Sequence, residues 1–144
     1  MNKNIRIAKN LVRIAKMLVE DEDADAKMDA AEDPKTPVDV LRELAEDGDF
    51  RVRSGVALNP NVSVEALTKL AEDEDWRVRW CAARNPNAPI DVLEKLAEDK
   101  DKHVRAGVAD NPNTPVDALI KLAKDEDWLV RQTTRKNPNF VSEK

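Results

Sequence analysis

The stretch that decides the fold is residues 111–136, NPNTPVDALIKLAKDEDWLVRQTTRK. The same pattern begins 26 residues earlier at Asn85, again at Asn59, and again at Asp33, where Asp-Pro-Lys replaces Asn-Pro-Asn. A fifth copy begins at Asn137 and stops after a few residues. A fixed period of about 20–50 residues is typical of a solenoid, in which each unit buries its apolar face against the next.

The first helix of each unit is predicted from a turn and a pair of leucines. Proline after Asx favours a turn, and Thr114 followed by Pro115 predicts a helix with the threonine as N-cap. Ser63 is predicted to cap one residue later in its unit, and Ala88 lacks a capping side chain, which weakens that start by about 1 kcal/mol. In the first unit, helical spacing predicts a buried face of Val38, Leu41, Leu44 and Ala45.

The second helix is predicted to begin after an aspartate cap such as Asp49 and to carry a constant valine three residues later. At about nine residues it is too short to be stable alone and must pack on its neighbours. An arginine follows each cap by four residues, as in Asp49 and Arg53, which predicts an ion-pair ladder built on the caps. The other predicted caps are Asp75, Asp101 and Asp127.

The period divides the chain into three parts. Residues 1–32 are interpreted as a degenerate N-terminal capping repeat, because their apolar positions fall on the same grid. Within this part, residues 3–19 predict a basic amphipathic helix, and docking of that helix on a membrane surface or an acidic partner is the alternative. The four repeats fill residues 33–136, as 33–58, 59–84, 85–110 and 111–136, and residues 137–144 are a truncated fifth repeat or a tail.

Three motifs resemble the short HEAT-like and leucine-rich-repeat-variant families. They are Asn-Pro-Asn-Thr-Pro from Asn111, Leu-x-x-Leu-Ala ending at Ala123, and Asp-Trp-x-Val-Arg from Asp127. The resemblance covers residues 33–139 and implies an all-α solenoid of two-helix repeats whose second helix is partly 3₁₀. One member of the variant family carries an iron–sulfur module on several cysteines. This chain has the single Cys81, so that function does not transfer and no cofactor is expected.

Bulk composition narrows the function classes. The formal net charge of −5 weighs against a generally nucleic-acid-binding surface. One cysteine excludes an internal disulfide and a multi-cysteine metal site, and it fits a reducing compartment, so the expected location is cytoplasmic. No apolar run approaches the roughly 18 residues of a membrane span. Cys81 occupies a small core position and His103 lacks a second ligand or a nucleophile, so no metal site and no enzyme activity are expected.

Charge segregation points to a binding surface. The four predicted second helices carry ten lysines or arginines and one acid, Asp110. By resemblance to HEAT-like solenoids, second helices line a concave groove. Trp80 is notable there, because its equivalents Ser54, Ala106 and Gln132 are smaller or polar, and aromatic residues beside arginines often form binding hot spots. The predicted binding residues are Arg51, Arg77, Trp80, Arg84, His103, Arg105 and Arg131.

Three hypotheses follow. The leading one is a non-enzymatic scaffold that binds a protein with an acidic or extended segment through the basic second-helix surface. The second is nucleic-acid binding in a basic groove, as in HEAT-like DNA glycosylases. The third is a structural repeat fragment without its own ligand, which self-associates through a C-terminal end where Leu119 and Leu122 are expected to be exposed.

Overall fold

The structure is a computed structural model that describes residues 2–6, 9–10, 13, 17 and 23–141. Over residues 23–141 it consists of α-helices joined by short turns, and no strand occurs among the described residues. The helices are α2 (Ala24–Glu32), α3 (Val38–Leu44), α4 (Phe50–Leu58), α5 (Val64–Leu70), α6 (Trp76–Arg84), α7 (Ile90–Leu96), α8 (Lys102–Asp110), α9 (Val116–Leu122) and α10 (Trp128–Lys136). The second helices α4, α6, α8 and α10 are α-helices of nine residues, so the 3₁₀ interpretation is wrong.

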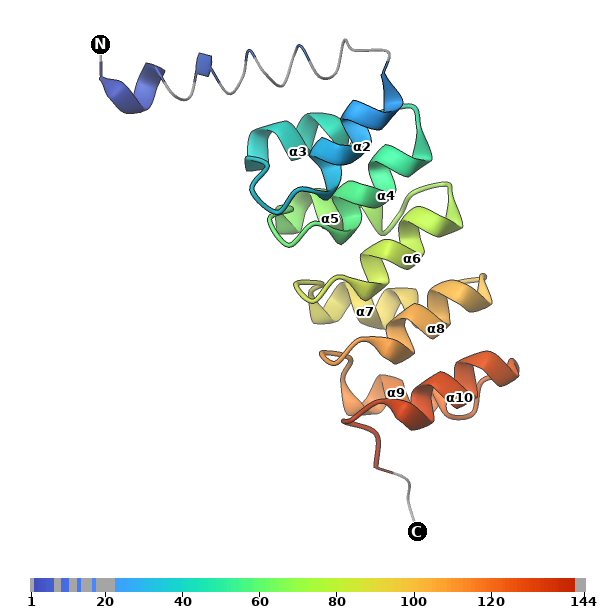
Figure 1. The fold of residues 1–144 in the computed structure, drawn as a ribbon. Coiled ribbons are helices and arrows are strands. Elements are labelled where there is room, and N and C mark those ends of the chain that lie inside the picture. The colour runs from blue at the N-terminus through green and yellow to red at the C-terminus, as the bar shows by residue number, and fades with distance from the viewer. Residues whose placement is uncertain (1, 7–8, 11–12, 14–16, 18–22, 142–144) are drawn as a thin grey trace.

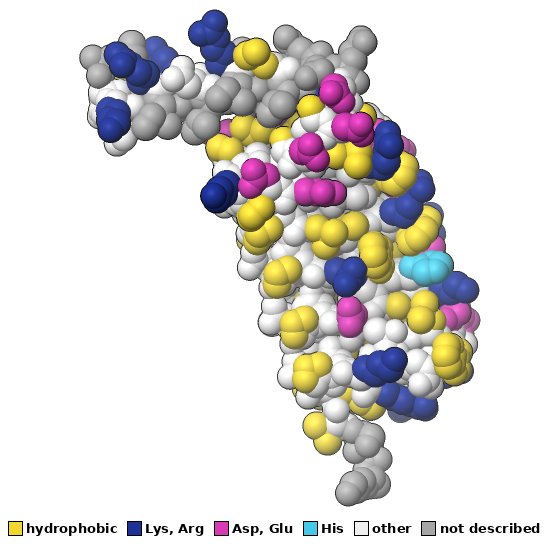
Figure 2. All heavy atoms as spheres, viewed as in Figure 1, with side chains coloured by type: hydrophobic (Ala, Val, Ile, Leu, Met, Phe, Trp, Pro, Cys, Tyr) yellow, Lys and Arg dark blue, Asp and Glu magenta, His cyan; other side chains and the backbone are white. Residues whose placement is uncertain are grey.

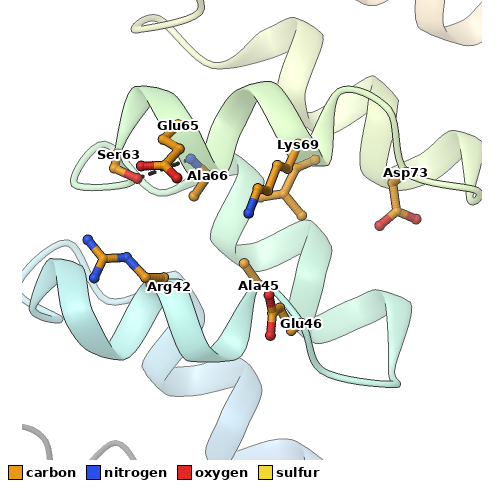
Figure 3. Close-up of a pocket in the computed structure, with 9 residues that line it drawn as sticks. Arg42, Ala45, Glu46, Ser63, Glu65, Ala66, Lys69 and Asp73 are labelled. Atoms are coloured by element: carbon orange, nitrogen blue, oxygen red, sulfur yellow. Dashed lines mark hydrogen bonds between the residues drawn. The ribbon is translucent and has the colours of Figure 1, made fainter.

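The helices form two layers of a solenoid (Figure 1). The second helices stack side by side in the order α2, α4, α6, α8, α10, and each first helix packs between the two second helices that flank it in sequence. Contacts between successive second helices are the most extensive in the stack. The first helices are splayed by comparison: Figure 3 shows residues of α3 and α5 facing one another across a hollow of about 160 Å³.

The buried face of the first helix differs from the predicted one at its start. Leu41 and Leu44 are buried, as expected, and Ala45 is half-buried. Val40 is buried in place of Val38, which is 37% exposed. The reason is helical spacing: α3 begins at Val38, and Val40 lies one turn before Leu44 on the inward stripe. The residues equivalent to Val38 are also exposed, namely Val64, Ile90 and Val116.

The predicted N-caps are confirmed at the second helices and at α5, and they are corrected at the other first helices. Each predicted aspartate accepts a backbone N–H, as Asp75 does from Arg77 at 2.9 Å. Ser63 caps α5, accepting from the N–H of Ala66. The threonines are not caps, because proline takes the N-cap position in α3, α7 and α9. Instead Thr114 Oγ1 donates to the carbonyl of Val108 at 2.6 Å, and Thr36 Oγ1 donates to the carbonyl of Ala30. The repeat with Ala88 therefore lacks this hydrogen bond to the preceding helix, and it does not lack a cap.

A ladder of buried asparagines joins the turns of successive repeats. Asn85 is fully buried, and its Nδ2 donates to the carbonyls of Ala57 at 2.7 Å and Asn59 at 3.2 Å. Its Oδ1 accepts the N–H of Asn87, which closes the turn. The asparagine ladder is Asn59, Asn85, Asn111 and Asn137, each bonded in this way to the repeat before it. The sequence interpretation treated these residues as turn formers only.

A second ladder joins the loops at the other end of the helices, and its pairs are not those predicted. Arg79 does not pair with Asp75 but with Asp99 of the next repeat, at 2.8 Å, and both side chains are more than nine-tenths buried. Arg79 also donates to the carbonyl of Asp73. The capping carboxylate of Asp75 is bonded to Arg77 instead. The arginine ladder is Lys27–Asp47, Arg53–Asp73, Arg79–Asp99 and Arg105–Asp125.

The two ends of the stack differ from the inner repeats. Helix α2 packs on α4 in the place of a second helix, and Lys27 begins the arginine ladder. The predicted helix of residues 3–19 lies largely outside the described residues, so the interpretation of residues 1–32 as a degenerate repeat stays a prediction. At the other end Leu119 and Leu122 are buried, so the prediction that they form an exposed apolar end is wrong.

Candidate binding groove on the second helices

A groove of about 780 Å³ crosses the second helices from α4 to α10. Figure 2 shows hydrophobic side chains interspersed with lysines and arginines over these helices. The volume of the groove falls within the range of about 300–1,000 Å³ that is usual for ligand sites. The lining residues are Ser54, Trp76, Arg77, Trp80, Cys81, Arg84, His103, Ala106, Gly107, Asp110, Leu129, Thr133 and Lys136.

One wall of the groove is an aromatic pair formed at the start of two helices. The rings of Trp76 and His103 are stacked, with centroids 4.8 Å apart and planes inclined by 28°. The caps Asp75 and Asp101 fix the starts of α6 and α8, which places these rings next to each other in the stack. Trp76 remains 37% exposed, as does Leu129 further along the wall. A largely apolar surface is thus left open to solvent.

The middle of the groove is built around Trp80. A Cβ at Gly107 of the next helix would lie 3.0 Å from Trp80 Cδ1, so the absence of a side chain at Gly107 makes room for the indole. The guanidinium of Arg84 lies over the indole, 4.8 Å from its centroid. Its Nε is 3.6 Å from the carboxylate of Asp110, and both side chains are well exposed. Trp80 therefore forms a cation–π contact with Arg84 over its ring.

Ion pairs take up much of the positive charge of the second helices. Arg77 Nη2 lies 2.8 Å from the carboxylate of Asp75, and the hydrogen bond from Arg77 lowers the pKa of Asp75 to about 2. The same guanidinium lies 3.5 Å from the centroid of the Phe50 ring. Lys102 lies 3.8 Å from Asp127. With the arginine ladder, these pairs make the groove a weakly charged apolar surface and not a broad basic one.

Of the seven predicted binding residues, the structure brings four together. Arg77, Trp80, Arg84 and His103 line the groove, and Arg51, Arg105 and Arg131 do not. Arg51 pairs with its own cap, Asp49, on α4. Arg105 is 9% exposed within the arginine ladder, where the hydrogen bond to Asp125 raises its pKa. Arg131, at the equivalent position, donates to the carbonyls of Asp125 and Glu126. The sequence interpretation missed Trp76, Leu129 and Lys136, although Leu129 and Lys136 occupy the same repeat positions as His103 and Arg84.

The groups that could carry chemistry are few. Cys81 lies in the groove floor and is 4% exposed, and burial raises the pKa of its thiol, so it is a poor nucleophile there. In the part of the chain that the structure describes, no three His, Cys, Asp or Glu side chains are placed to hold a metal ion. No described helix combines the length and the hydrophobicity that a membrane span requires.

Two segments of the chain match a known family model. Residues 50–75 and 103–127 match the model described as leucine rich repeat variant. The first segment contains α4 and α5, and the second contains most of α8 and all of α9, so each match covers a second helix and the first helix that follows it. A search among curated proteins found no match. These two segments are thus similar to leucine rich repeat variant repeats, a HEAT-like helical repeat, and the two-layered stack shows an all-α solenoid around them.

Proposed function

We propose that the chain is a non-enzymatic interaction scaffold that binds an extended segment of another protein in the groove across α6, α8 and α10. The observation that carries the proposal is the partly exposed aromatic cluster of Trp76, Trp80 and His103 in that groove. Exposed aromatic residues beside arginines are common anchors in protein interfaces. A buried free thiol at Cys81 is compatible with a reducing compartment such as the cytoplasm.

Trp80 supports the proposal because the repeat does not require it. Ser54 and Ala106 occupy its position in the neighbouring repeats, and both repeats fold with the same helices and ladders. The chain accommodates the indole by having glycine at position 107. A large aromatic side chain that is not needed for stacking, yet lies in an open groove, is best explained by binding.

Nucleic-acid binding receives less support. Its affinity comes largely from lysines and arginines that neutralise phosphates. Arg77 and Lys102 each lie near a carboxylate of this chain, and the ladder arginines are largely buried. A phosphate backbone would have to displace these carboxylates.

The test is to select peptides from a random displayed library and to measure their binding by calorimetry and tryptophan fluorescence. We expect Trp80→Ala to abolish binding of the selected peptides. The matched control is Trp128→Ala, because Trp128 is 66% exposed and does not line the groove. Equal binding by wild type and Trp80→Ala would refute the proposal. Tight, steeply salt-dependent binding of single-stranded DNA, lost in Trp80→Ala, would favour the nucleic-acid alternative.

A further inference from the structure

The spacing of the groove matches one peptide conformation. The groove begins at Ser54 of α4, and its other lining residues lie on α6, α8 and α10. Its walls therefore repeat once per packed helix, and packed helices lie about 8–10 Å apart. A polyproline II helix has three residues per turn and rises about 3.1 Å per residue, so equivalent side chains recur about every 9 Å. In a β-strand, side chains on one face recur about every 6.6 Å, which does not match. We propose that the groove binds a proline-containing peptide in the polyproline II conformation; this inference rests on the proposed function.

The backbone chemistry of the groove favours the same conformation. Its walls are α-helices, whose N–H and C=O groups are bonded within each helix and cannot pair with a β-strand. The Arg77 side chain, which could donate to a peptide carbonyl, is bonded to Asp75. A polyproline II peptide keeps its backbone hydrated, and each proline removes a donor that would otherwise lose water on binding. The peptide therefore docks through its side chains.

The side chains of the groove suit proline rings with an acid beside them. The Trp76–His103 pair and the Trp80 indole offer flat aromatic surfaces, and Ala106 and Gly107 leave a shallow floor between them. At the ends of α6, α8 and α10 the lining residues are Arg84, Asp110 and Lys136, a net positive edge. Each helix contacts every third residue of the peptide, so three helices bind a segment of about nine residues. A carboxylate of the peptide faces this positive edge.

The test compares two synthetic peptides of identical length and composition, each with one terminal glutamate. Both contain three prolines, which lie three residues apart in one peptide and two residues apart in the other. We expect wild-type protein to bind the first peptide at least about tenfold more tightly, a difference that calorimetry resolves readily. Trp80→Ala should lose this preference, and Trp128→Ala should keep it. Equal affinity for the two peptides, or binding of neither, would overturn the inference.

The library selection separates this inference from the proposed function. Selected peptides that need Trp80 but show no three-residue proline spacing would overturn the polyproline II inference and leave the proposed function intact. Selected peptides whose binding does not depend on Trp80 would overturn both. Replacing the terminal glutamate by glutamine should weaken binding to wild type several-fold and have less effect on Lys136→Gln; an equal effect on both proteins would refute the assigned role of Lys136.

Discussion

The turn edge of the stack and the groove across the second helices relate differently to the 26-residue period. At the turn edge the same residue recurs in successive repeats, and Asn59, Asn85 and Asn111 make the same bonds to the repeat before. In the groove, the middle position changes from Ser54 to Trp80 to Ala106. Recurring residues hold one repeat on another, whereas a residue that breaks the period, such as Trp80, is not needed for stacking and under the proposed function contacts the partner.

Substitution in the asparagine ladder is expected to have the largest effect on stability. Asn85→Ala removes both donors from the carbonyls of Ala57 and Asn59 and leaves them buried without these bonds. We expect the free energy of unfolding to fall by about 4 kcal/mol, since each unsatisfied buried polar group costs roughly 1–3 kcal/mol. Urea denaturation followed by circular dichroism measures the change. The control is Asn87→Ala, whose exposed bond to the Pro60 carbonyl should contribute about 1 kcal/mol or less. Equal losses in the two variants would contradict a structural role for the asparagine ladder.

Two arginines on α6 give a matched pair for the arginine ladder. Arg79→Gln leaves the carboxylate of Asp99 buried without its partner, and we expect a loss of about 3 kcal/mol. Arg77→Gln removes an exposed pair with Asp75 and should cost less than about 1 kcal/mol. Denaturant unfolding of both variants measures the difference. Similar stabilities of the two variants would show that burial does not make the Arg79–Asp99 pair stronger than the exposed Arg77–Asp75 pair. The double variant Arg79→Gln with Asp99→Asn should recover part of the stability that Arg79→Gln loses.

The fit between Trp80 and Gly107 predicts an interaction between two substitutions. Gly107→Ala alone places a methyl group 3.0 Å from Trp80 Cδ1 and should destabilise the protein by about 1 kcal/mol, the overpacking cost exceeding the gain in helix propensity. In a Trp80→Ala background the same change should cost less, because the clash with the indole is gone and only the contact with Ala83 Cβ at 3.3 Å stays tight. A double-mutant cycle of unfolding free energies checks this coupling. Additive effects would mean that Gly107 is not there to accommodate Trp80.

The third repeat lacks a hydroxyl that two others use. Thr36 and Thr114 each donate to a carbonyl of the preceding helix, and Ala88 occupies the equivalent buried position. Ala88→Thr places a donor near the carbonyl of Ala82, and we expect it to raise the free energy of unfolding by about 1 kcal/mol. Thermal unfolding of this variant beside Thr114→Ala, which should lose a similar amount, measures the effect. A destabilised Ala88→Thr would show that the third repeat is packed differently.

The smallest expected effect is the pH dependence of the cap beside the groove. Arg77 lowers the pKa of Asp75 from 3.8 to about 2, so this carboxylate stabilises the folded state fully above about pH 4. That contribution is lost as the pH falls through 2, because the folded-state carboxylate then becomes protonated. Acid titration of wild type and Asp75→Asn, followed by circular dichroism, should show a stability difference that shrinks only below about pH 4. A difference that stays constant down to pH 2 would contradict the shifted pKa.

Several features could be predicted from the sequence because they are local. The two helices of each unit and the aspartate caps depend on residues close together in the chain, and the 26-residue period repeats them; the helices and the caps were found where expected. The inward leucines follow from helical spacing alone. The burial of Val40 in place of Val38 was missed because both valines lie at helical spacing from a buried leucine, and only the packing shows that the inward stripe runs through Val40 and Leu44.

The partners of the polar residues could not be predicted, because they lie one repeat away. Asn85 bonds to residues 26 and 28 positions earlier, and Arg79 pairs with a residue 20 positions later. Sequence spacing favoured the nearer aspartate, and only the stacked helices show which carboxylate the guanidinium reaches. The replacement of asparagine by Asp33 in the first unit is a signal that could have pointed to the ladder, since an ionised aspartate has no side-chain donor for it.

By itself, the sequence determined that this protein is a stack of two-helix repeats, because capping and apolar spacing act over a few residues and the 26-residue period repeats them along the chain. Only the tertiary structure decided which surface is open. Stacking places the second helices together, brings Trp76 next to His103 and Trp80 above Gly107, and buries the arginines of the ladder. The physical reason is that charge in a sequence adds up residue by residue, whereas charge on a surface remains only where no carboxylate from the adjoining repeat lies within reach.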